Sequence, residues 1–204
     1  CSGLSSITLG NGLDTIGNSA FENCINLTNV NVDLYSRIGV IGAKAFYNCQ
    51  ALQNFQVPIS VTSIGDAAFS ECYSMRHIEL CGNGANVSLT TLGPDVFAGC
   101  ANLESLTFPR TYTNNGKAID ISIFDGCNAL KFISVSNNLL TFVDEKGYSF
   151  EDFQKDVPKE FYFEGLSNSP LHSLATEHNF AFSHLGQDLY EITVVDPKDK
   201  SIKA

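Results

Sequence analysis

The stretch IGDAAFSECYSMRHIEL, residues 64–80, decides the fold, because its pattern recurs along the first two thirds of the chain. Each copy contains a phenylalanine, a cysteine three residues later and a large apolar residue three residues after the cysteine. A fixed period of this kind indicates a repeat architecture, so it takes precedence over local helix and strand signals. The five phenylalanines are Phe21, Phe46, Phe69, Phe97 and Phe124, and the cysteines are Cys24, Cys49, Cys72, Cys100 and Cys127.

The full repeat reads I-G-x-x-A-F-x-x-C-x-x-L-x-x-I-x-L. Cys1, Leu4, Ile7 and Leu9 fit its second half, so we expect the chain to open inside a repeat of a longer protein. Consecutive repeat cysteines are separated by 23, 25, 23, 28 and 27 residues, in or near the range of leucine-rich repeats. The length variation falls at one place in the repeat, which predicts loops along one edge of the stack. The insertions are Asp33–Arg37, Cys81–Ser88 and Arg110–Asn115.

Each repeat predicts one turn of a right-handed α/β solenoid, a horseshoe with a parallel β-sheet on its concave side. L-x-x-I-x-L is a short strand whose last two apolar residues point the same way. The A-F segment belongs on the opposite wall as a short helical or 3₁₀ turn, with its phenylalanine between the walls. The glycine after the isoleucine indicates a corner where a Cβ would clash or φ must be positive. Because no repeat buries its apolar face alone, we expect capped ends.

The pattern resembles the BspA-like leucine-rich repeat family. Residues 64–72, residues 92–109 with their closing Phe108-Pro109, and Val57-Pro58 carry the resemblance. The fifth copy departs from it, with Asp120 for glycine and Ile123 for alanine, so we expect a distorted corner there. The resemblance implies a secreted or cell-surface protein of a host-associated microbe and adhesion to host or matrix proteins.

Beyond residue 135 the repeat is lost, and we predict a C-terminal α+β capping region over 136–195. Ser149 is a candidate cap for a short helix over 150–157, and residues 160–164 are a candidate strand with Phe161 and Phe163 on one side. Ser169-Pro170 predicts a second helix start. A strand follows at 180–182, residues 189–195 are strand-like, and 196–204 is a polar tail or linker. The repeat array itself covers 1–135.

Composition excludes several classes of function. Hydrophobic residues make up 44% and charged residues 17% of the 204 residues, as in a folded globular protein. The net charge is −10, so the basic face that a nucleic-acid-binding protein needs is missing. No apolar run approaches the length of a transmembrane helix, and no signal peptide is visible. We therefore expect no nucleic-acid partner and no direct membrane insertion.

The cysteines have a structural interpretation. Six of the seven occupy one repeat position, so stacking should place Cys1, Cys24, Cys49, Cys72, Cys100 and Cys127 in one interior column of small apolar side chains. Disulfides between neighbouring turns would require suitable Cβ directions, and a lipidated N-terminal Cys1 is a second interpretation. Cys81, at the start of the longest insertion, stands outside the column as a bystander or a free thiol.

The sequence predicts neither a catalytic centre nor a metal or cofactor site. The histidines are His77, His172, His178 and His184, and no pair has the spacing of a helical zinc motif. There is no CxxC pair, nucleophile elbow, phosphate loop or dinucleotide motif, and residues 144–147 do not match a calcium loop. The protein is therefore predicted not to be an enzyme.

The candidate binding residues are the outward positions of the repeat strands. The first three turns offer hydroxyl and amide side chains, whereas turns four to six add charges and an aromatic ring. Exposed aromatic and arginine side chains carry a disproportionate share of binding energy. The candidate site residues are Arg76, His77, Glu79, Glu104 and Phe132, with the insertion 81–88 as a rim and Tyr112 contributed by the next insertion.

Two functions fit this sequence. One is a monomeric, extracellular or cell-surface binding module, of adhesion type, for a protein or glycan ligand of host or matrix origin. The other is a structural spacer that presents a further domain. An exposed apolar patch favours the first, and a uniformly polar surface favours the second.

Overall fold

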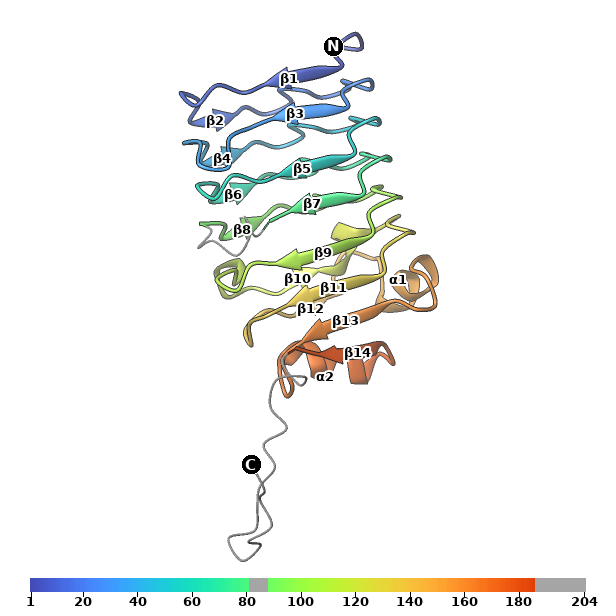
Figure 1. Ribbon diagram of the computed structural model, residues 1–204. Coiled ribbons are helices and arrows are strands. Elements are labelled where there is room, and N and C mark those ends of the chain that lie inside the picture. The colour runs from blue at the N-terminus through green and yellow to red at the C-terminus, as the bar shows by residue number, and fades with distance from the viewer. Residues whose placement is uncertain (81–87, 186–204) are drawn as a thin grey trace, which may run out of the picture.

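The computed structural model describes residues 1–80 and 88–185. Figure 1 shows a single stack of chain turns. Each turn as far as residue 143 adds one strand to a front wall and one to a second wall, and the last part of the chain adds strands to the front wall alone. The front wall contains β1 (Ser6–Thr8), β3 (Asn29–Asn31), β5 (Asn54–Gln56), β7 (His77–Glu79), β9 (Ser105–Phe108), β11 (Phe132–Val135), β13 (Tyr162–Gly165) and β14 (Ala181–His184). The second wall contains β2 (Thr15–Ile16), β4 (Val40–Ile41), β6 (Ser63–Ile64), β8 (Thr91–Leu92), β10 (Ile119–Asp120) and β12 (Phe142–Val143).

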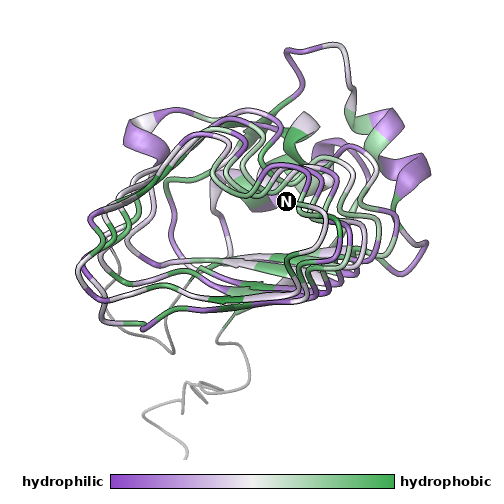
Figure 2. Ribbon diagram, turned by 90° about the horizontal axis from the view of Figure 1, so that it is seen from above, coloured by the Kyte–Doolittle hydropathy of each residue, from purple (hydrophilic) through white to green (hydrophobic). Residues whose placement is uncertain are grey.

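The strand pairing confirms the predicted leucine-rich-repeat solenoid. Six front strands form a sheet in the order β14-β13-β11-β9-β7-β5, β1 pairs with β3, and the second wall pairs β2-β4-β6-β8 and β10-β12. Each described pair of strands is parallel and joins equivalent positions of neighbouring turns. Viewed along the stack in Figure 2, the coils superimpose around one shared interior.

The A-F segment forms a turn instead of the expected helical turn in four of the five copies. In these turns the residues two before and two after the phenylalanine have positive φ, as Ala67 (51°) and Glu71 (62°) do beside Phe69. Alternate N–H groups of the turn donate to carbonyls of the next coil, for example Phe46 N–H to the Ala68 oxygen at 2.8 Å. Because these N–H groups are satisfied between coils, they are not available to an intrahelical ladder.

The fifth copy is the exception, and its corner differs as expected. It forms the 3₁₀ helix η3 (Ile121–Phe124), which a second short 3₁₀ segment, η2 (Asn114–Gly116), precedes. Asp120, in the place of the repeat glycine, accepts a hydrogen bond from the Ser122 N–H at 2.9 Å and so caps η3. The acidic substitution therefore starts a helix at the position where the other copies make a glycine corner.

The repeat phenylalanines form a continuous column of stacked rings through the core. Ring centroids are 5.2 Å apart for Phe21 and Phe46, 5.3 Å for Phe46 and Phe69, and 6.3 Å for Phe69 and Phe97. The distance from Phe97 to Phe124 is again 6.3 Å. These separations fall within the range in which aromatic pairs attract beyond their buried area, so the column ties each coil to the next.

The cysteine column is confirmed for the five cysteines that follow the phenylalanines. These five are buried free thiols, whereas Cys1 is exposed, so its predicted place in the interior is wrong. No described coil lies above Cys1 to cover it. Each thiol from the third coil onward donates to the phenylalanine carbonyl of the preceding coil, at 3.1 Å for Cys49 to Phe21 and 3.2 Å for Cys72 to Phe46. Burial raises the pKa of Cys49 and of Cys100 to about 12.

The repeat glycines allow the coils to approach closely. A Cβ on Gly65 would lie 2.5 Å from the Ala43 nitrogen and 2.8 Å from the Ala43 Cα. Gly42 and Gly93 are equally crowded by the backbone of the coil before them, whereas a Cβ on Gly17, in the first complete repeat, would meet nothing within 4 Å. None of these glycines has positive φ, so the close approach is the reason for glycine here and the strained-backbone alternative is wrong.

Both walls continue through the point at which the repeat pattern ends. β13 pairs with β11, β14 pairs with β13, and β12 pairs with β10, so residues after 135 add strands to both sheets. The predicted strands over 160–164 and 180–182 correspond to β13 and β14, and the predicted helices to α1 (Phe150–Asp156) and α2 (Pro170–Glu177). The sequence predictions for 189–195 and 196–204 lie outside the described residues.

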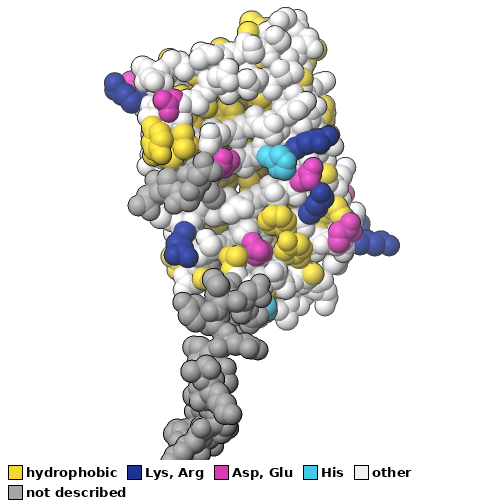
Figure 3. Space-filling model, viewed as in Figure 1, with side chains coloured by type: hydrophobic (Ala, Val, Ile, Leu, Met, Phe, Trp, Pro, Cys, Tyr) yellow, Lys and Arg dark blue, Asp and Glu magenta, His cyan; other side chains and the backbone are white. Residues whose placement is uncertain are grey.

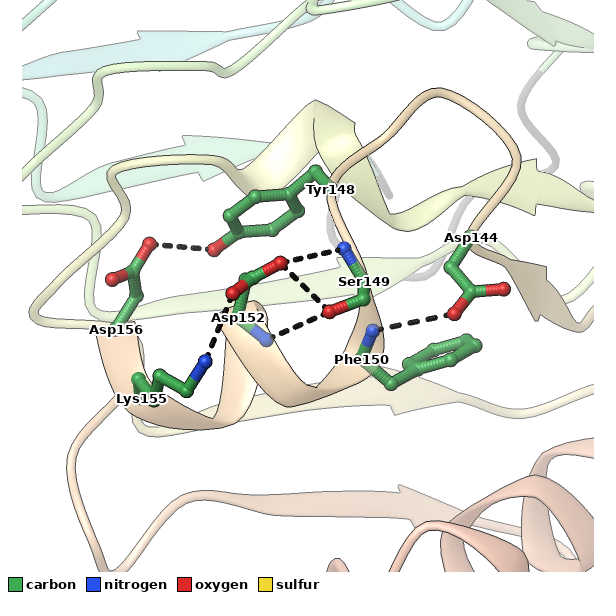
Figure 4. A network of polar contacts seen from close by, with 7 residues as sticks. All are labelled: Asp144, Tyr148, Ser149, Phe150, Asp152, Lys155 and Asp156. Atoms are coloured by element: carbon green, nitrogen blue, oxygen red, sulfur yellow. Dashed lines mark hydrogen bonds and ion pairs between the residues drawn. The ribbon is translucent and has the colours of Figure 1, made fainter.

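A polar network fixes the start and end of α1 (Figure 4). The Ser149 hydroxyl accepts from the Asp152 N–H at 3.1 Å, and the Asp152 carboxylate accepts from the Ser149 N–H at 3.2 Å, which completes a capping box. The Ser149 hydroxyl also donates to this carboxylate, and together with Lys155 it lowers the pKa of Asp152 to about 2. Tyr148 donates to Asp156 at 2.7 Å, so both ends of the helix are tied to the preceding loop.

We predict that Gly65→Ala destabilises the protein by about 1–3 kcal/mol, because its Cβ would force two coils apart. Gly17→Ala is the matched control and should change stability by less than about 0.5 kcal/mol, since nothing lies near its Cβ. Urea unfolding followed by circular dichroism measures both. Equal losses for the two variants would contradict the close-approach explanation.

We also predict that the thiol column does not react while the protein is folded. In a Cys1→Ser/Cys81→Ser variant at pH 8, a disulfide reagent should modify no thiol until denaturant is added, and then all five. Burial keeps the reagent away from all five thiols. The raised pKa of Cys49, Cys72, Cys100 and Cys127 also keeps these four protonated, and only the thiolate is nucleophilic. Rapid labelling of the folded variant would show that the column is accessible.

Candidate binding face

Alternation along the front strands separates core from surface. In β7, Ile78 is buried, while His77 is exposed and Glu79 is partly exposed. Successive side chains of a strand point to opposite faces, so the parallel register collects the outward residues into columns across the wall. One column contains Ser6, Asn29, Asn54, His77, Ser105, Phe132, Tyr162 and Ala181.

The outward columns change character between β5 and β7. Over β1, β3 and β5 they contain hydroxyl and amide side chains, joined by hydrogen bonds such as Asn29 Nδ2 to Asn31 Oδ1 at 2.9 Å. Over β7 to β13, charged, imidazole and aromatic side chains gather, as Figure 3 shows. We call this second part the β7–β13 face. It consists of Arg76, His77, Glu79, Glu104, Phe132 and Tyr162.

An aromatic pair lies at the β13 end of the β7–β13 face. The rings of Phe132 and Tyr162, from β11 and β13, stack with centroids 5.4 Å apart and an interplanar angle of 16°. Both side chains are partly exposed on the outer surface of the sheet. Tyr162 was not among the predicted site residues. The alternation with Phe161 and Phe163 already placed it on the opposite side from those two, so the signal was present in the sequence.

An ion pair lies beside these rings. Lys131 Nζ is 2.7 Å from Glu104 Oε2, and the two side chains are 57% and 33% exposed. The hydrogen bond and charge of Lys131 lower the pKa of Glu104, so this carboxylate is ionised at neutral pH. On the other side of the face, Gln56 Nε2 donates to Glu79 Oε2 at 3.0 Å, which fixes the second carboxylate.

A cavity opens between β7 and β9. These strands pair only at His77 and Ser105, whereas β11 pairs with β9 over four positions. The opening has a volume of about 300 Å³ and is lined by His77, Ile78, Glu79, Leu80, Ser105 and Thr107. Its outer rim is polar and its floor contains the inward-facing Ile78 and Leu80, so it can bind a small group that combines polar and apolar surface.

Five of the six predicted site residues lie together on this face. Arg76 and His77 are exposed, and Glu79, Glu104 and Phe132 are partly exposed on β7, at the start of β9 and on β11. The predicted rim over 81–88 falls almost entirely outside the described residues. No group of three potential metal-binding side chains occurs within 1–80 and 88–185.

The prediction that Tyr112 contacts a ligand is wrong. Its side chain is 0% exposed and packs against Phe108, with ring centroids 5.4 Å apart. Its hydroxyl donates to Asn114 Oδ1 at 3.1 Å, and its carbonyl accepts from Asn137 Nδ2 at 2.8 Å. The insertion 110–115 therefore places its aromatic ring in the core, because burial of the ring is favourable, while Arg110, Thr111 and Asn115 are exposed.

Parallel strands added one per turn around a phenylalanine column define a leucine-rich-repeat solenoid. The family model of the BspA type Leucine rich repeat region matches six copies in this chain, over residues 1–117 and 39–152. These matches cover more than half of the chain, which therefore belongs to the BspA-type leucine-rich repeat family. A comparison with curated proteins finds no match.

This chain is similar to solved structures of leucine-rich repeat proteins, and the first of them shares its fold. The T. pallidum leucine-rich repeat protein is 20% identical, with a TM-score of 0.61 over 88% of this chain and 86% of that chain. A leucine-rich repeat protein from Bacteroides ovatus is 21% identical, with a TM-score of 0.40 over 81% of this chain and 63% of that one. A leucine rich cell surface protein from Faecalibacterium prausnitzii is 18% identical, with a TM-score of 0.40 over 90% and 64%.

In the part of the chain that the structure describes, no helix could cross a membrane. The longest, α2, has eight residues, whereas a spanning helix needs about 20.

We predict that Lys131→Met raises the pKa of Glu104 toward its ordinary value of 4.5. In the unmodified protein the folded-state pKa is lowered, so the pair stabilises the fold above the ordinary pKa of glutamate and loses this effect as the pH falls through the lowered value. Carbon NMR titration of the carboxylate measures the shift. Lys155→Met, which removes a lysine beside Asp152, is the control and should leave Glu104 unchanged.

Proposed function

We propose that this protein is a non-catalytic binding module that holds a protein or glycan ligand on the β7–β13 face. The observation that carries the proposal is the exposed Phe132–Tyr162 stack among ionised side chains, on a wall that is otherwise covered by small polar groups. Two partly exposed rings side by side keep apolar surface in contact with water unless a ligand covers them. Aromatic and arginine side chains also dominate binding energy at protein surfaces.

The rigidity of the wall supports this proposal. Phe132 and Tyr162 stand on β11 and β13, which pair over four positions with each neighbouring strand, and the Phe132 ring is held by stacking on Tyr162. Side chains that are ordered before binding lose little conformational entropy when a ligand arrives, so more of the contact energy appears as affinity.

The chemistry of the described residues favours binding over catalysis. The five column thiols are buried, and burial raises the pKa of Cys49, Cys72, Cys100 and Cys127, which removes them as nucleophiles. On the β7–β13 face, His77 is the single imidazole, and the Glu104 carboxylate already has Lys131 as its partner. This arrangement provides hydrogen bonds and charge complementarity rather than a paired acid and base.

The proposed setting is extracellular or on the cell surface, with a monomeric protein and a ligand of host or matrix origin. The net charge of −10 argues against nucleic acid and anionic lipid surfaces as partners. The family to which the chain belongs supports the binding role, because repeat solenoids use their extended sheet surface to bind partners.

The test is a screen of the protein against immobilised matrix proteins and a glycan array. We expect binding that Arg76→Ala/Phe132→Ala weakens by about tenfold or more, since both residues are of the types that dominate hot spots. Asn29→Ala/Asn54→Ala, on the polar part of the same wall, is the matched control and should bind as the unmodified protein does. Circular dichroism checks that both variants fold.

Three outcomes are informative. Loss in the first variant alone supports the β7–β13 face. Binding by both variants at the level of the unmodified protein contradicts the choice of face. Absence of binding to every protein and glycan tested contradicts the binding function and favours the spacer role.

A further inference from the structure

The column of outward residues on the front wall contains a row of rings with one interruption. Tyr162, Phe132, Ser105 and His77 occupy equivalent positions on β13, β11, β9 and β7, and each is paired in register with the next. Tyr162 and Phe132 stack directly at 5.4 Å, which shows that rings on neighbouring strands of this column contact face to face. Ser105 carries no ring, so one strand with a short side chain separates Phe132 from His77 along this column.

The strand spacing sets the width of this interval. Neighbouring strands lie about 4.8 Å apart, so His77 and Phe132, two strands apart, are separated by roughly 10 Å. A ring placed above Ser105 would lie about 5 Å from each of them, within the range of favourable ring stacking. The interval, which we call the ring slot and define by His77, Ser105 and Phe132, therefore has the width for one ring.

Hydrogen-bonding groups stand at both ends of the ring slot. At one end the Glu104 carboxylate, ionised and paired with Lys131, precedes Ser105 in the chain. At the other end the cavity of about 300 Å³, which His77 and Ser105 also line, contains the side chains of Glu79 and Thr107. A ligand ring in the slot would thus meet apolar surface from Phe132 on a face and oxygen atoms around its edge.

We infer that the ring slot binds a neutral six-membered sugar ring of a glycan. This inference rests on the proposed function, because it places the ligand on the same β7–β13 face. A sugar ring has C–H groups on its faces and hydroxyl groups around its edge, which is the distribution that the slot complements. The carboxylates of Glu79 and Glu104 accept hydrogen bonds from hydroxyls. Their two negative charges are balanced by Lys131 and Arg76 beside them, so the slot favours a neutral ring over an acidic or a basic one.

An aromatic side chain of a protein partner fits the slot less well. It has the same flat faces, but its edge is C–H with at most one polar group. It would remove water from the Glu79 and Glu104 carboxylates, which Gln56 and Lys131 already contact, without adding a hydrogen bond to either. Desolvating polar groups without a new hydrogen bond in return reduces affinity.

The experiment compares Ser105→Phe with Ser6→Phe. The first variant places a ring in the slot and continues the stack of Phe132 and Tyr162, and the second adds the same bulk to the same column on β1. Both positions face outward on the sheet, and circular dichroism checks folding. The probes are an array of oligosaccharides with neutral hexose, neutral N-acetylhexosamine or acidic terminal residues, and matrix glycoproteins before and after enzymatic deglycosylation.

We expect the unmodified protein and Ser6→Phe to bind neutral glycans equally, and Ser105→Phe to bind them about tenfold or more weakly. Deglycosylation should remove binding to the matrix glycoproteins. Neutral-glycan binding that Ser105→Phe leaves intact overturns the slot, as does binding confined to acidic glycans.

The failure of this inference and the failure of the proposed function are distinguishable. If deglycosylated proteins bind as well as the glycosylated ones, and Arg76→Ala/Phe132→Ala still removes binding, the β7–β13 face stands and the sugar ligand is wrong. If none of the glycans or matrix proteins binds, both proposals are wrong.

Discussion

The structure depends on stacking successive coils at the single spacing that hydrogen bonds between parallel strands impose. Each coil uses its N–H groups on the coil beside it, in both walls and in the turns between them, as Phe46 N–H does with the Ala68 carbonyl. A coil in isolation would leave these groups and its apolar face exposed, so the stack is stable only as a whole. The constant spacing explains why the same type of residue recurs at each position of the repeat. Gly65 keeps the coils close, Phe69 fills the interior, and Cys72 is small enough for the column and still donates to a carbonyl.

The same constraint explains where the chain is free to vary. Extra residues inside a coil would break the pairing with both neighbours, so insertions fall between the end of a front strand and the next second-wall strand. The insertion 110–115 shows that an addition at this edge can also contribute a side chain to the core. It carries Tyr112, and the ring packs on Phe108 in the core while Asn137 secures its backbone. The fifth copy departs from the repeat because Asp120 stands in the place of the glycine. The Asp120 side chain caps the 3₁₀ helix η3, which replaces the turn of the other copies.

The side chains that do not take part in the stacking of the coils are the ones available for binding. The outward positions of the front wall contribute nothing to the core, so their chemistry can change from coil to coil at little cost in stability. Between β5 and β7 it does change, from amides and hydroxyls to charges and rings, while the backbone beneath remains regular. A rigid wall with a locally distinct surface is well suited to hold a ligand, and the register of the strands decides which of its side chains become neighbours.

The sequence alone determined the coil, the inward residues and the position of Arg76, His77, Glu79, Glu104 and Phe132 on one face, because a fixed repeat converts sequence offsets into spatial columns. It also predicted the capped helices after residue 135. There Ser149 and Ser169 each accept a hydrogen bond from a backbone N–H three residues later, so the cap is a local feature of the sequence. Only the tertiary structure decided that Tyr112 is buried, that Cys1 is exposed and that Tyr162 stacks on Phe132. The burial of Tyr112 and the Phe132–Tyr162 stack depend on contacts between segments that follow no common period. Such contacts are set by packing in three dimensions, which a local pattern of residues does not encode.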